Sequence, residues 1–451
     1  MIIITIDNAQ SRILCKDMLL FNRLSDLLSY DVPGKAFAMR HCKWKGWDGK
    51  VRLLKNTGNF PTGLLPNILK YLRTNGISYD LQYNMQRPKK SIDIVNNSEW
   101  APRDYQQTAL DRSDKYSRGV VVMGVGGGKT YTASLIVQDK GVPTLFVTPD
   151  TGLREQAYED FCEYFVDGDK YVSKDFYSDK PIIIHNIQSL VNKPSDAFKR
   201  FQMLMIDEFH HSASDSYIKL NMVASKAYYR YGLTGSYLRA DGHDMKMLGV
   251  LSHVVYKKTA SELIKEGWLV PPYITFMPFN AAMEGVSYAK AYNQTLYGLP
   301  FNKIVAKITR QKIKENKQTL VLVGRKRQGR IINELTDNTY FLSGDDDLEY
   351  REYMKAKFIK KEIPCLIATS IFGEGQNIKS IDVLINARLQ ESEIQTTQGI
   401  GRALRKSEGK KHAEVFDFLI HGNKHLLKHS KSRLETYRKE SEFKIFIKKN
   451  I

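Results

Sequence analysis

Cysteine is scarce in this chain: among 451 residues only Cys15, Cys42, Cys162 and Cys365 occur. No two of them form a Cys-x-x-Cys pair, so the sequence predicts neither a zinc site nor a framework of disulfides. This usage is typical of a reducing compartment, and we therefore expect a cytoplasmic protein.

Long hydrophobic runs are missing as well. No apolar stretch approaches the roughly 18 residues that cross a bilayer. The start of the chain, Met1–Ile6, has the pattern of a strand and lacks the basic leader of a signal peptide. Low-complexity tracts are also absent. Because 42% of the residues are hydrophobic, we expect a folded chain of about two to four domains.

Negative charge is in deficit. Lys and Arg number 68 against 49 Asp and Glu, so the formal net charge is +19. Such an excess favours a polyanionic partner, and nucleic acid is the first candidate. Charge alone does not separate DNA, RNA and an anionic membrane, but the sequence shows neither a lipid anchor nor a membrane-surface helix. We therefore expect a nucleic-acid partner and no membrane partner.

A glycine-rich loop that ends in Lys-Thr is the most informative feature present. It spans Met123–Thr130 and lies between an apolar run and a helical pattern. Strand, loop and helix in this order are the context of a phosphate-binding loop, whose glycines let backbone N–H groups surround phosphate oxygens. Lys129 can reach the β- and γ-phosphates, and the Thr130 hydroxyl can hold Mg²⁺. The strict pattern has glycine at the first position, where this chain has Met123.

Two neighbouring carboxylates, Asp207 and Glu208, follow a second apolar run at 203–206. A carboxylate at the tip of a strand can complete a Mg²⁺ site, and its neighbour can orient and deprotonate a water molecule. Together with the glycine-rich loop, this pair supplies the parts of a nucleoside triphosphatase that uses ATP and Mg²⁺.

The order of apolar segments predicts an α/β fold. From Trp100 onward apolar runs alternate with helical patterns, which is typical of parallel sheets covered by helices on both faces. The first series of expected strands is 119–123, 144–148, 181–184, 203–206 and 230–234. The second series is 319–323, 339–342, 364–369, 381–386 and 413–419. We therefore expect two parallel-sheet lobes of similar size.

Five parts of the chain follow from this pattern. They are a small α+β domain over residues 1–95, a first lobe over 96–260, a connector over 261–315, a second lobe over 316–420 and a basic helical tail over 421–451. A polar linker with Pro88 falls at 87–97. The tail has nine Lys or Arg against three Glu. It either packs on the second lobe with a solvated basic face or follows a phosphate backbone.

A basic patch with two indoles marks the N-terminal domain between His41 and Lys50. Cations beside aromatic rings suit phosphate contacts and stacking on bases. The alternative is that Trp47 is a core anchor next to a hairpin turn at Asp48-Gly49. The residues that we assign to DNA contact are Lys43, Lys45, Trp47 and Lys50.

Two arginines close the second lobe. Arg402 and Arg405 lie three residues apart and would share one face of a helix. A pair of guanidinium groups can neutralise the charge that develops on a transferring phosphoryl group. Two surface arginines on a helix are the alternative.

The order of these motifs over residues 100–420 resembles the superfamily 2 helicases of the DExH type, with RecA-like lobes. The segments that carry the resemblance are Arg103–Gln106, Met123–Thr130, Phe146–Gln156, Ile187–Leu190, Asp207–His210, Gly232–Ser236, Leu320–Arg325, Ile367–Asn377 and Gln398–Arg405. Within the superfamily, the chain is similar to the phage recombination helicases of the UvsW kind. The segments for that likeness are Gly46–Leu54, Phe60–Leu64 and Leu263–Pro271.

For the nucleotide, the resemblance implies that Gln106 contacts the adenine. Mg²⁺ would be held by Thr130 directly and by Asp207 through water. The phosphate ligands would be the backbone amides of Gly126, Gly127, Gly128 and Thr130 with the side chain of Lys129.

For catalysis, the resemblance implies that Glu208 activates the attacking water. Arg402 and Arg405 would complete the site from the second lobe, and His210 would connect the carboxylates to Gln398. Asn377 stands where many relatives have Asp, which leaves the role of that position open.

For DNA, the resemblance implies phosphate contacts by Thr148, Gln188 and Thr369 at strand ends. Such contacts carry no sequence information, so forks and junctions would be recognised by their structure. The expected function is an ATP-dependent DNA helicase or translocase that unwinds or branch-migrates forked and junction DNA in replication and recombination. We expect it to act as a monomer, in the host cytoplasm if a phage encodes it.

Three other functions are alternatives. An RNA helicase of the DExH type would have the same motor motifs. The motor subunit of a restriction system would need a nuclease cluster of carboxylates and lysine, and the sequence shows none besides the motor residues. A nucleic-acid-binding scaffold with an inactive ATP site would not need Lys129, Glu208 and the two arginines.

Overall fold

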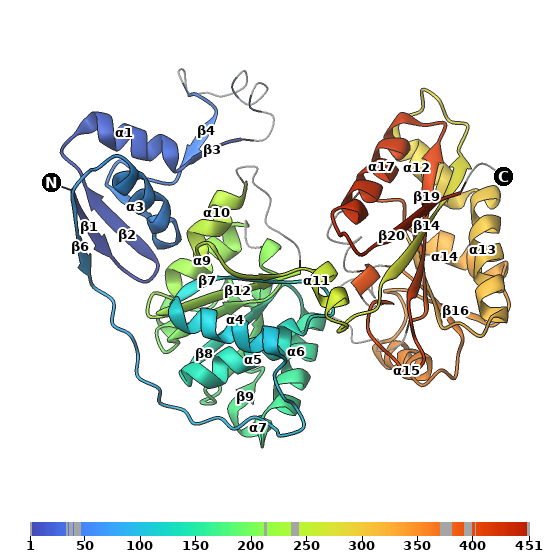
Figure 1. Cartoon of the computed structure of the whole chain (residues 1–451), viewed down its shortest axis with the longest axis horizontal. Helices are drawn as coiled ribbons and strands as arrows, with labels where there is room; N and C mark the ends of the chain where they lie inside the picture. Colours follow the sequence, from blue (N-terminus) through green and yellow to red (C-terminus); the bar gives the residue numbers. More distant parts are fainter. Residues whose placement is uncertain are drawn as a thin grey trace. The chain divides into compact units, whose positions relative to one another are not determined.

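The computed structural model describes residues 2–32, 35, 39, 47–211, 214–235, 243–369, 381–391, 399–401 and 403–448. The chain divides into two compact units (Figure 1). The first unit contains Met1–Met123 and Gly128–Lys257, and the second contains Gly124–Gly127 and Lys258–Ile451. Among the residues described, no helix is long and apolar enough to cross a membrane.

The N-terminal domain is a four-stranded sheet whose buried face packs on two helices. The strand order is β5-β2-β1-β6, with β1 antiparallel to β2 and parallel to β6. Ile2, Ile4 and Ile6 are buried and alternate with more exposed residues, as in a strand with one face on a core. The elements are β1 (Ile2–Ile6), β2 (Gln10–Leu14), α1 (Met18–Leu27), β3 (Ser29–Asp31), β4 (Lys50–Arg52), β5 (Asn59–Pro61), α3 (Leu65–Thr74) and β6 (Tyr79–Tyr83).

This domain packs closely on the first lobe. At Gly63 a Cβ atom would lie 2.0 Å from the carbonyl oxygen of Leu248, so only glycine permits the observed approach. Nearby, Arg118 Nη2 donates a hydrogen bond of 2.6 Å to the carbonyl oxygen of Asn8. The elements in contact are η1 (Thr62–Leu64) and α10 (His243–Val250).

The segment 87–97, expected to be a linker, runs from β6 along the outside of the first lobe (Figure 1) and is held to it by hydrogen bonds. The N–H groups of Ser91 and Ile92 donate to the carbonyl oxygen of Gly141 at 2.8 and 3.0 Å. Further along, Gln138 Nε2 donates to the Ile94 carbonyl oxygen at 3.1 Å. The segment therefore does not act as a free spacer.

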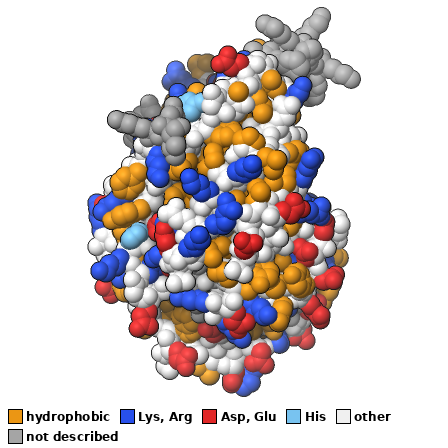
Figure 2. Space-filling model, turned by 90° about the vertical axis from the view of Figure 1, so that its right-hand side faces the viewer, with side chains coloured by type: hydrophobic (Ala, Val, Ile, Leu, Met, Phe, Trp, Pro, Cys, Tyr) orange, Lys and Arg blue, Asp and Glu red, His pale blue; other side chains and the backbone are white. Residues whose placement is uncertain are grey.

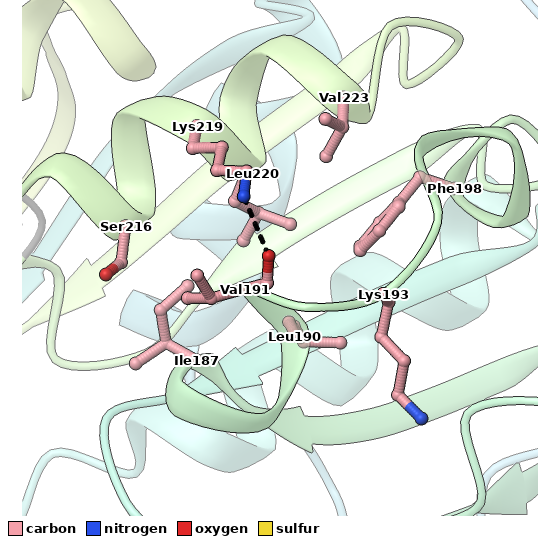
Figure 3. Close-up of a pocket in the computed structure, with 9 residues that line it drawn as sticks. All are labelled: Ile187, Leu190, Val191, Lys193, Phe198, Ser216, Lys219, Leu220 and Val223. Atoms are coloured by element: carbon pink, nitrogen blue, oxygen red, sulfur yellow. Dashed lines mark hydrogen bonds between the residues drawn. The ribbon is translucent and has the colours of Figure 1, made fainter.

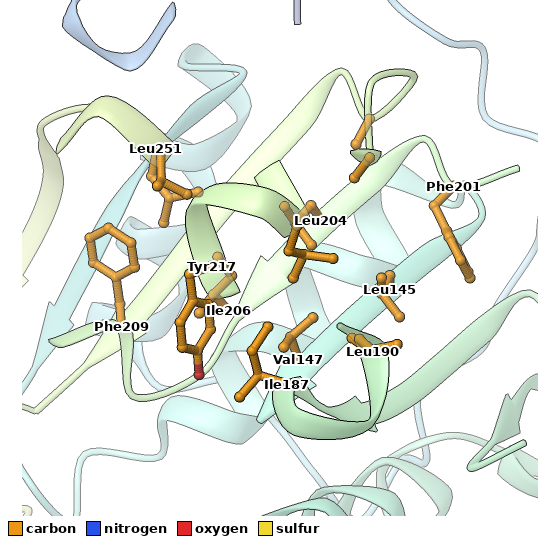
Figure 4. Packing of buried hydrophobic residues seen from close by; sticks show 14 of the residues in the cluster. Leu145, Val147, Ile187, Leu190, Phe201, Leu204, Ile206, Phe209, Tyr217 and Leu251 are labelled. Carbon is orange, nitrogen blue, oxygen red and sulfur yellow. The ribbon is translucent and has the colours of Figure 1, made fainter. Parts of the chain in front are cut away.

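The first lobe is built on a seven-stranded sheet with the order β13-β7-β12-β11-β8-β10-β9. Every residue of β8, β11 and β12 is buried, as expected when helices cover both faces. Leu145, Val147, Leu204 and Ile206 form one core cluster with Phe209 (Figure 4). The strands are β7 (Arg118–Met123), β8 (Thr144–Thr148), β9 (Val172–Ser173), β10 (Ile182–Asn186), β11 (Met203–Ile206), β12 (Tyr229–Thr234) and β13 (Val254–Lys258). The main helices are α4 (Asp104–Lys115), α5 (Lys129–Lys140), α6 (Thr151–Tyr164), α8 (Ile187–Leu190) and α9 (Asp215–Val223).

The second lobe is built on another seven-stranded sheet, with the order β16-β17-β15-β18-β19-β14-β20. All pairings between neighbours run parallel. The strands are β14 (Pro272–Asn280), β15 (Thr319–Val323), β16 (Thr339–Leu342), β17 (Cys365–Ala368), β18 (Val383–Ala387), β19 (Ala413–His421) and β20 (Lys444–Ile447). The main helices are α11 (Ala260–Lys265), α12 (Tyr288–Tyr297), α13 (Leu299–Lys314), α14 (Lys326–Glu334), α15 (Leu348–Ile359) and α17 (Lys424–Arg438).

The expected α/β fold of two parallel-sheet lobes with a small N-terminal domain is confirmed. All ten expected lobe strands are present, with ends within two residues of the expected ones. The sequence does not predict β9, β13, β14 or β20. Pro272 and Pro278 disfavour a strand at β14, since proline cannot donate to a ladder, and β20 is a short run in a charged tail. The segment 261–315, expected to be a connector, thus supplies β14, α12 and α13 to the second lobe.

The basic tail packs on the second lobe, which is the first of the two alternatives. In α17, Leu426, Arg433 and Tyr437 are buried, and Arg433 Nη2 lies 2.8 Å from Asp417 Oδ1 in β19. Part of the tail's positive charge is therefore internal. On the face that Figure 2 draws, Lys and Arg side chains are dispersed among hydrophobic and acidic ones and form no continuous basic track.

We predict that Gly63→Ala destabilises the first unit, because the added methyl group must displace the backbone of α10. A cost of about 1–3 kcal/mol is expected for such overpacking. Urea unfolding of the full chain measures it. Gly344→Ala is the matched control, because a Cβ at Gly344 meets nothing within 4 Å. Equal midpoints for the two variants would show that the domain is not held at Gly63.

Candidate nucleotide site and nucleic-acid interface

The glycine-rich loop has the backbone of a phosphate cradle. Gly126 and Gly128 have φ values of 85° and 79°, a left-handed conformation that residues with a side chain rarely adopt. The α5 helix begins directly afterwards at Lys129. Its first N–H groups lack helical acceptors and, with the helix dipole, form an anion site.

The position of Met123 in the structure accounts for the departure from the strict loop pattern. Its side chain is fully buried at the end of β7. Its sulfur accepts a contact of 3.7 Å from Thr132 Oγ1 in α5. The first position of the loop therefore belongs to the core, where a large apolar side chain fits.

Gln106 lies against the end of the loop. A Cβ at Gly128 would meet Gln106 Nε2 at 2.6 Å, so the amide group is in contact with the loop backbone. Gln106 is buried, and its Oε1 accepts a 3.0 Å bond from the Arg103 N–H at the start of α4. This arrangement fixes the amide beside the glycine-rich loop; the adenine contact of Gln106 stays a prediction.

The acid pair lies at the carboxyl end of β11 and is buried. Lys129 Nζ donates to Glu208 Oε1, so the loop lysine and the second carboxylate form an ion pair. Asp207 Oδ1 accepts a 2.8 Å bond from the Glu208 N–H. Glu208 has a φ of 44°, an uncommon conformation for a residue with a side chain, which indicates local strain at the site.

Burial and charge move the pKa values of the two carboxylates apart. Burial, with the neighbouring Glu208 charge, raises the pKa of Asp207 well above its usual range. Burial opposes ionisation of Glu208 too, but the Lys129 ammonium and His210 outweigh it and hold the pKa of Glu208 below its usual range. Glu208 is therefore the ionised member of the pair.

His210 connects the acid pair to the end of β12. Its Nδ1 lies 3.2 Å from Glu208 Oε2 and 3.3 Å from Thr234 Oγ1. Its expected partner Gln398 lies outside the described residues, so the link to the second lobe stays a prediction.

The two strand ends assigned to DNA in the first lobe lie side by side, since Thr148 pairs with Asn186 in the sheet. Gln188, two residues later, donates through Nε2 to the Pro149 carbonyl oxygen and is exposed. Thr148 is buried, and its hydroxyl donates to the Asp150 carbonyl oxygen at 3.0 Å. Gln188 is thus presented to solvent, whereas the Thr148 hydroxyl is not.

The basic patch of the N-terminal domain is described only in part, because Lys43 and Lys45 lie outside the described residues. Trp47 is half-buried and donates through Nε1 to the Lys50 carbonyl oxygen at 2.9 Å. Asp48 Oδ1 accepts from the Lys50 N–H at 3.2 Å, and Gly49 has a φ of 72°. The alternative of an anchoring indole beside an Asp-Gly turn thus has structural support, and Lys50 still reaches solvent.

The second lobe places its candidate residues at separate points. Thr369 follows the carboxyl end of β17 and is half-buried. Residues 399–401 and 403 are helical, whereas the backbone of Arg405 pairs with Leu269 in an isolated bridge. The expectation of one helical face for Arg402 and Arg405 is therefore wrong for Arg405, because the chain has left the helix. Arg402 lies outside the described residues.

Comparison with known proteins adds three matching family models in chain order. They are "DNA helicase UvsW, N-terminal" over residues 3–83, "Type III restriction enzyme, res subunit" over 99–239 and "Helicase conserved C-terminal domain" over 301–407. The ATP-dependent DNA helicase uvsW of Enterobacteria phage T4 is 25% identical over 487 residues, covering 96% of both chains. The chain is a UvsW-like helicase of superfamily 2.

Two further relatives place this UvsW-like helicase in a wider group. The putative ATP-dependent RNA helicase L396 of Acanthamoeba polyphaga mimivirus is 27% identical, over 77% of this chain and 72% of its own. The solved fragment of a putative HsdR subunit of a type I restriction enzyme from Vibrio vulnificus YJ016 has a TM-score of 0.57 at 18% identity, over 70% of this chain and 64% of its own. The latter likeness shows a shared fold.

In the UvsW-like helicase, three aromatic side chains pack together next to the glycine-rich loop, and this packing was not predicted from the sequence. The rings of Trp100, Tyr131 and Tyr164 pack in edge-to-face and tilted contacts with centroids 4.8–5.8 Å apart, and the Tyr131 hydroxyl donates to the Trp100 carbonyl oxygen. Tyr131 directly follows Thr130. The only signal in the sequence is the position of Trp100 just before the adenine-reading segment.

A small apolar hollow beside α8 does not belong to the chemistry. It is lined by residues of α8, α9 and the segment between them, and one of its two lysines, Lys219, donates through Nζ to the Val191 carbonyl oxygen at 2.9 Å (Figure 3). No cluster of three or more metal-ligating side chains occurs in the described part of this helicase.

We predict that Gly128→Ala weakens nucleotide binding by about tenfold or more, because the methyl group enters the space of Gln106 and strains the left-handed backbone. Titration with a fluorescent ATP analogue and Mg²⁺ measures the Kd. Gly76→Ala is the matched control. It has a similar φ of 63°, but a Cβ there meets nothing within 4 Å. If both variants bind nucleotide like the parent, the cradle assignment fails.

Proposed function

We propose that this protein is an ATP-dependent DNA helicase or translocase that unwinds or branch-migrates forked and junction DNA in replication and recombination. The observation that carries the proposal is the contact of Lys129 with Glu208 at the carboxyl end of β11, beside a loop with the backbone of a phosphate cradle. Similarity over 96% of the chain to a DNA helicase supports it.

Lys129 and the loop amides would bind the phosphates, with Gln106 at the adenine. The residues present fit Mg²⁺, because this ion is bound through few carboxylates and substrate phosphates rather than in a cage of side chains. Thr130 and Asp207 would hold it, and it would neutralise charge on the phosphates. Glu208, the ionised carboxylate, would orient the attacking water and accept its proton.

The guanidinium groups of Arg402 and Arg405 would neutralise the charge that develops on the transferring phosphoryl group. Loss of such an arginine slows phosphoryl transfer by ~10³-fold or more. His210, which contacts both Glu208 and Thr234, would report the state of the site through Gln398.

DNA would contact the strand ends of both lobes and the N-terminal basic patch. In the first lobe the contact would come from Gln188 and from backbone groups near Thr148, whose hydroxyl is buried. In the second lobe it would come from Thr369. These contacts go to phosphates, so the enzyme would distinguish forks from duplexes by structure and not by sequence.

RNA is the second candidate substrate, because a relative with 27% identity is named as a putative RNA helicase. Stimulation of ATP hydrolysis by matched DNA and RNA forks separates the two. A binding scaffold without ATPase activity would show no stimulation by either polymer.

We predict that Glu208→Gln lowers DNA-stimulated ATP hydrolysis by about 10²–10⁴-fold, because the general base is lost. Nucleotide binding should persist, since Lys129 remains. Lys129→Ala should lose both hydrolysis and tight nucleotide binding. Steady-state ATPase assays with forked DNA, together with nucleotide titrations, measure these effects.

The matched control for these variants is Glu163→Gln, an exposed carboxylate of α6 in the same lobe. It should hydrolyse ATP like the parent. Parental turnover by Glu208→Gln or Lys129→Ala would rule out the motor function.

We also predict that replacing Lys43, Lys45 and Lys50 by Gln weakens binding to forked DNA and flattens its salt dependence. Each lost phosphate contact lowers the slope of log K against log salt by about 0.9. The control replaces Lys115, Lys226 and Lys360, which are exposed elsewhere. The affinity of each triple variant for forked DNA is measured by fluorescence anisotropy over a series of salt concentrations. Identical slopes for the two triple variants would contradict the assignment of the patch to DNA.

A further inference from the structure

The segment Asn386–Glu391 contains the last two residues of β18 and the four residues that follow; further along the chain, residues 399–401 are helical. The segment is the last described part of the chain before the stretch that leads to Gln398. Almost every residue of this segment is held by a side chain from a different element of the second lobe. Such fixation is unusual for a loop, because loops normally bond to water or to themselves.

Hydrogen bonds hold three successive residues at the start of the segment, the first through its side chain and the next two through their carbonyl oxygens. Asn386 Nδ2 donates to Asp417 Oδ2 at 3.0 Å. Gln328 Nε2 from α14 donates to the Ala387 carbonyl oxygen at 3.0 Å. Tyr292 from α12 donates through its hydroxyl to the Arg388 carbonyl oxygen at 2.9 Å.

The end of the segment is held by α17. Arg433 Nη1 donates to the Gln390 carbonyl oxygen at 3.0 Å, and His429 Nε2 lies 3.2 Å from Glu391 Oε2. Between these two groups of contacts lies Leu389, which is buried and has a φ of 58°. A left-handed leucine persists only where its surroundings determine it.

Arg433 and Asp417 form a fully buried ion pair beneath this segment. Arg433 divides its donors: Nε and Nη2 bind Asp417, Nη2 also donates to the Phe418 carbonyl oxygen at 2.9 Å, and Nη1 is left for Gln390. A buried ion pair is not needed to attach a helix, because apolar side chains often do so at lower cost. The guanidinium group of arginine has several N–H donors that point in different directions, and this is needed to bind a carboxylate and a loop carbonyl oxygen at once.

The network continues to the turn that precedes Arg402. Arg388 is buried and donates through Nε to Asn386 Oδ1 at 3.3 Å. A Cβ at Gly399 would lie 3.2 Å from Arg388 Nη2, so this guanidinium group contacts the helical turn at Gly399. Contacts therefore run without a gap from α17 through Asp417, Asn386 and Arg388 to Gly399.

We propose that Arg433 is a positioning residue of the ATPase, which fixes the segment Asn386–Glu391 and, through Arg388, the helical turn that leads to Arg402. This inference rests on the proposed function. It gives the C-terminal helix a role in phosphoryl transfer in addition to its role in packing. The contacts needed for catalysis would be lost when the carbonyl bond to Gln390 is lost, even if α17 stays in place.

Arg433→Lys tests the proposal, because lysine keeps the charge beside Asp417 but cannot also donate to Gln390. We expect kcat of DNA-stimulated ATP hydrolysis to fall about tenfold, since a small misplacement of a catalytic group costs up to ~10²-fold. KM for ATP and the Kd of a fluorescent ATP analogue should stay within about twofold, because the lobe that holds Lys129 is unchanged.

Arg438→Lys is the matched control: it makes the same change on the same helix, where Arg438 is exposed and pairs with Glu435 at the surface. It should keep the parental kcat. If kcat of Arg433→Lys equals that of Arg438→Lys, the proposal is overturned. If the parent itself hydrolyses no ATP with DNA, the proposed function fails instead, so the two failures are distinguishable.

Tyr292→Phe covers the case in which Arg433→Lys does not fold, because it removes one hydroxyl that holds the Arg388 carbonyl oxygen. It should lower kcat by about threefold or more without a change in KM. This is the pattern expected when a variant loses an interaction that stabilises the transition state but not the bound substrate. Where both variants fold, the fold-reduction in kcat of the double variant should be smaller than the product of the two single fold-reductions, because both substitutions act on one segment. An unchanged kcat in Tyr292→Phe, or fully multiplicative losses, would overturn the proposal.

Discussion

The ion pair between Lys129 and Glu208 is the interaction on which the nucleotide site depends. Two adjacent carboxylates are buried at the end of β11, where neither is well solvated, and Lys129 supplies the charge that keeps Glu208 ionised. Binding of a nucleotide would draw Lys129 towards the phosphates, and Mg²⁺ would then supply positive charge near Asp207. Exchange of one cation for another would allow the acids to stay buried in both states.

The second lobe meets a similar constraint with Arg433 and Asp417. Removing one member of such a buried pair typically costs 3–5 kcal/mol, because an uncompensated charge remains, whereas an apolar replacement of both is often neutral. The pair is therefore better explained by what it positions than by the stability it adds. It lies beside Asn386, close to the carboxyl end of β18, and the loops that follow such strand ends often carry function in parallel sheets. Each lobe thus contains a buried ion pair; under the proposed function the first would serve chemistry and the second loop placement.

Much of the fold was predictable because parallel strands buried on both faces are continuous apolar runs. The runs at 144–148 and 203–206 are strands with unchanged bounds. Strand β14 escapes prediction because its prolines argue against a ladder, although its neighbours tolerate them. The glycine-rich loop and the acid pair were predictable because each is a short motif of neighbouring residues in the sequence. The burial of the Thr148 hydroxyl, the extended backbone at Arg405 and the Arg433–Asp417 pair were not, because each depends on residues far away in the chain.

The docking of the N-terminal domain limits how that domain can work. His210 contacts Thr234 at the end of β12, and the chain then continues to α10, whose residues pack under Gly63 at backbone contact. The polar segment 87–97 is attached to the same lobe, so no free spacer separates the domain from the acid pair. A domain held in this way does not move independently of the first lobe. The described end of its basic patch, Trp47 to Lys50, therefore belongs to the same compact unit as the acid pair.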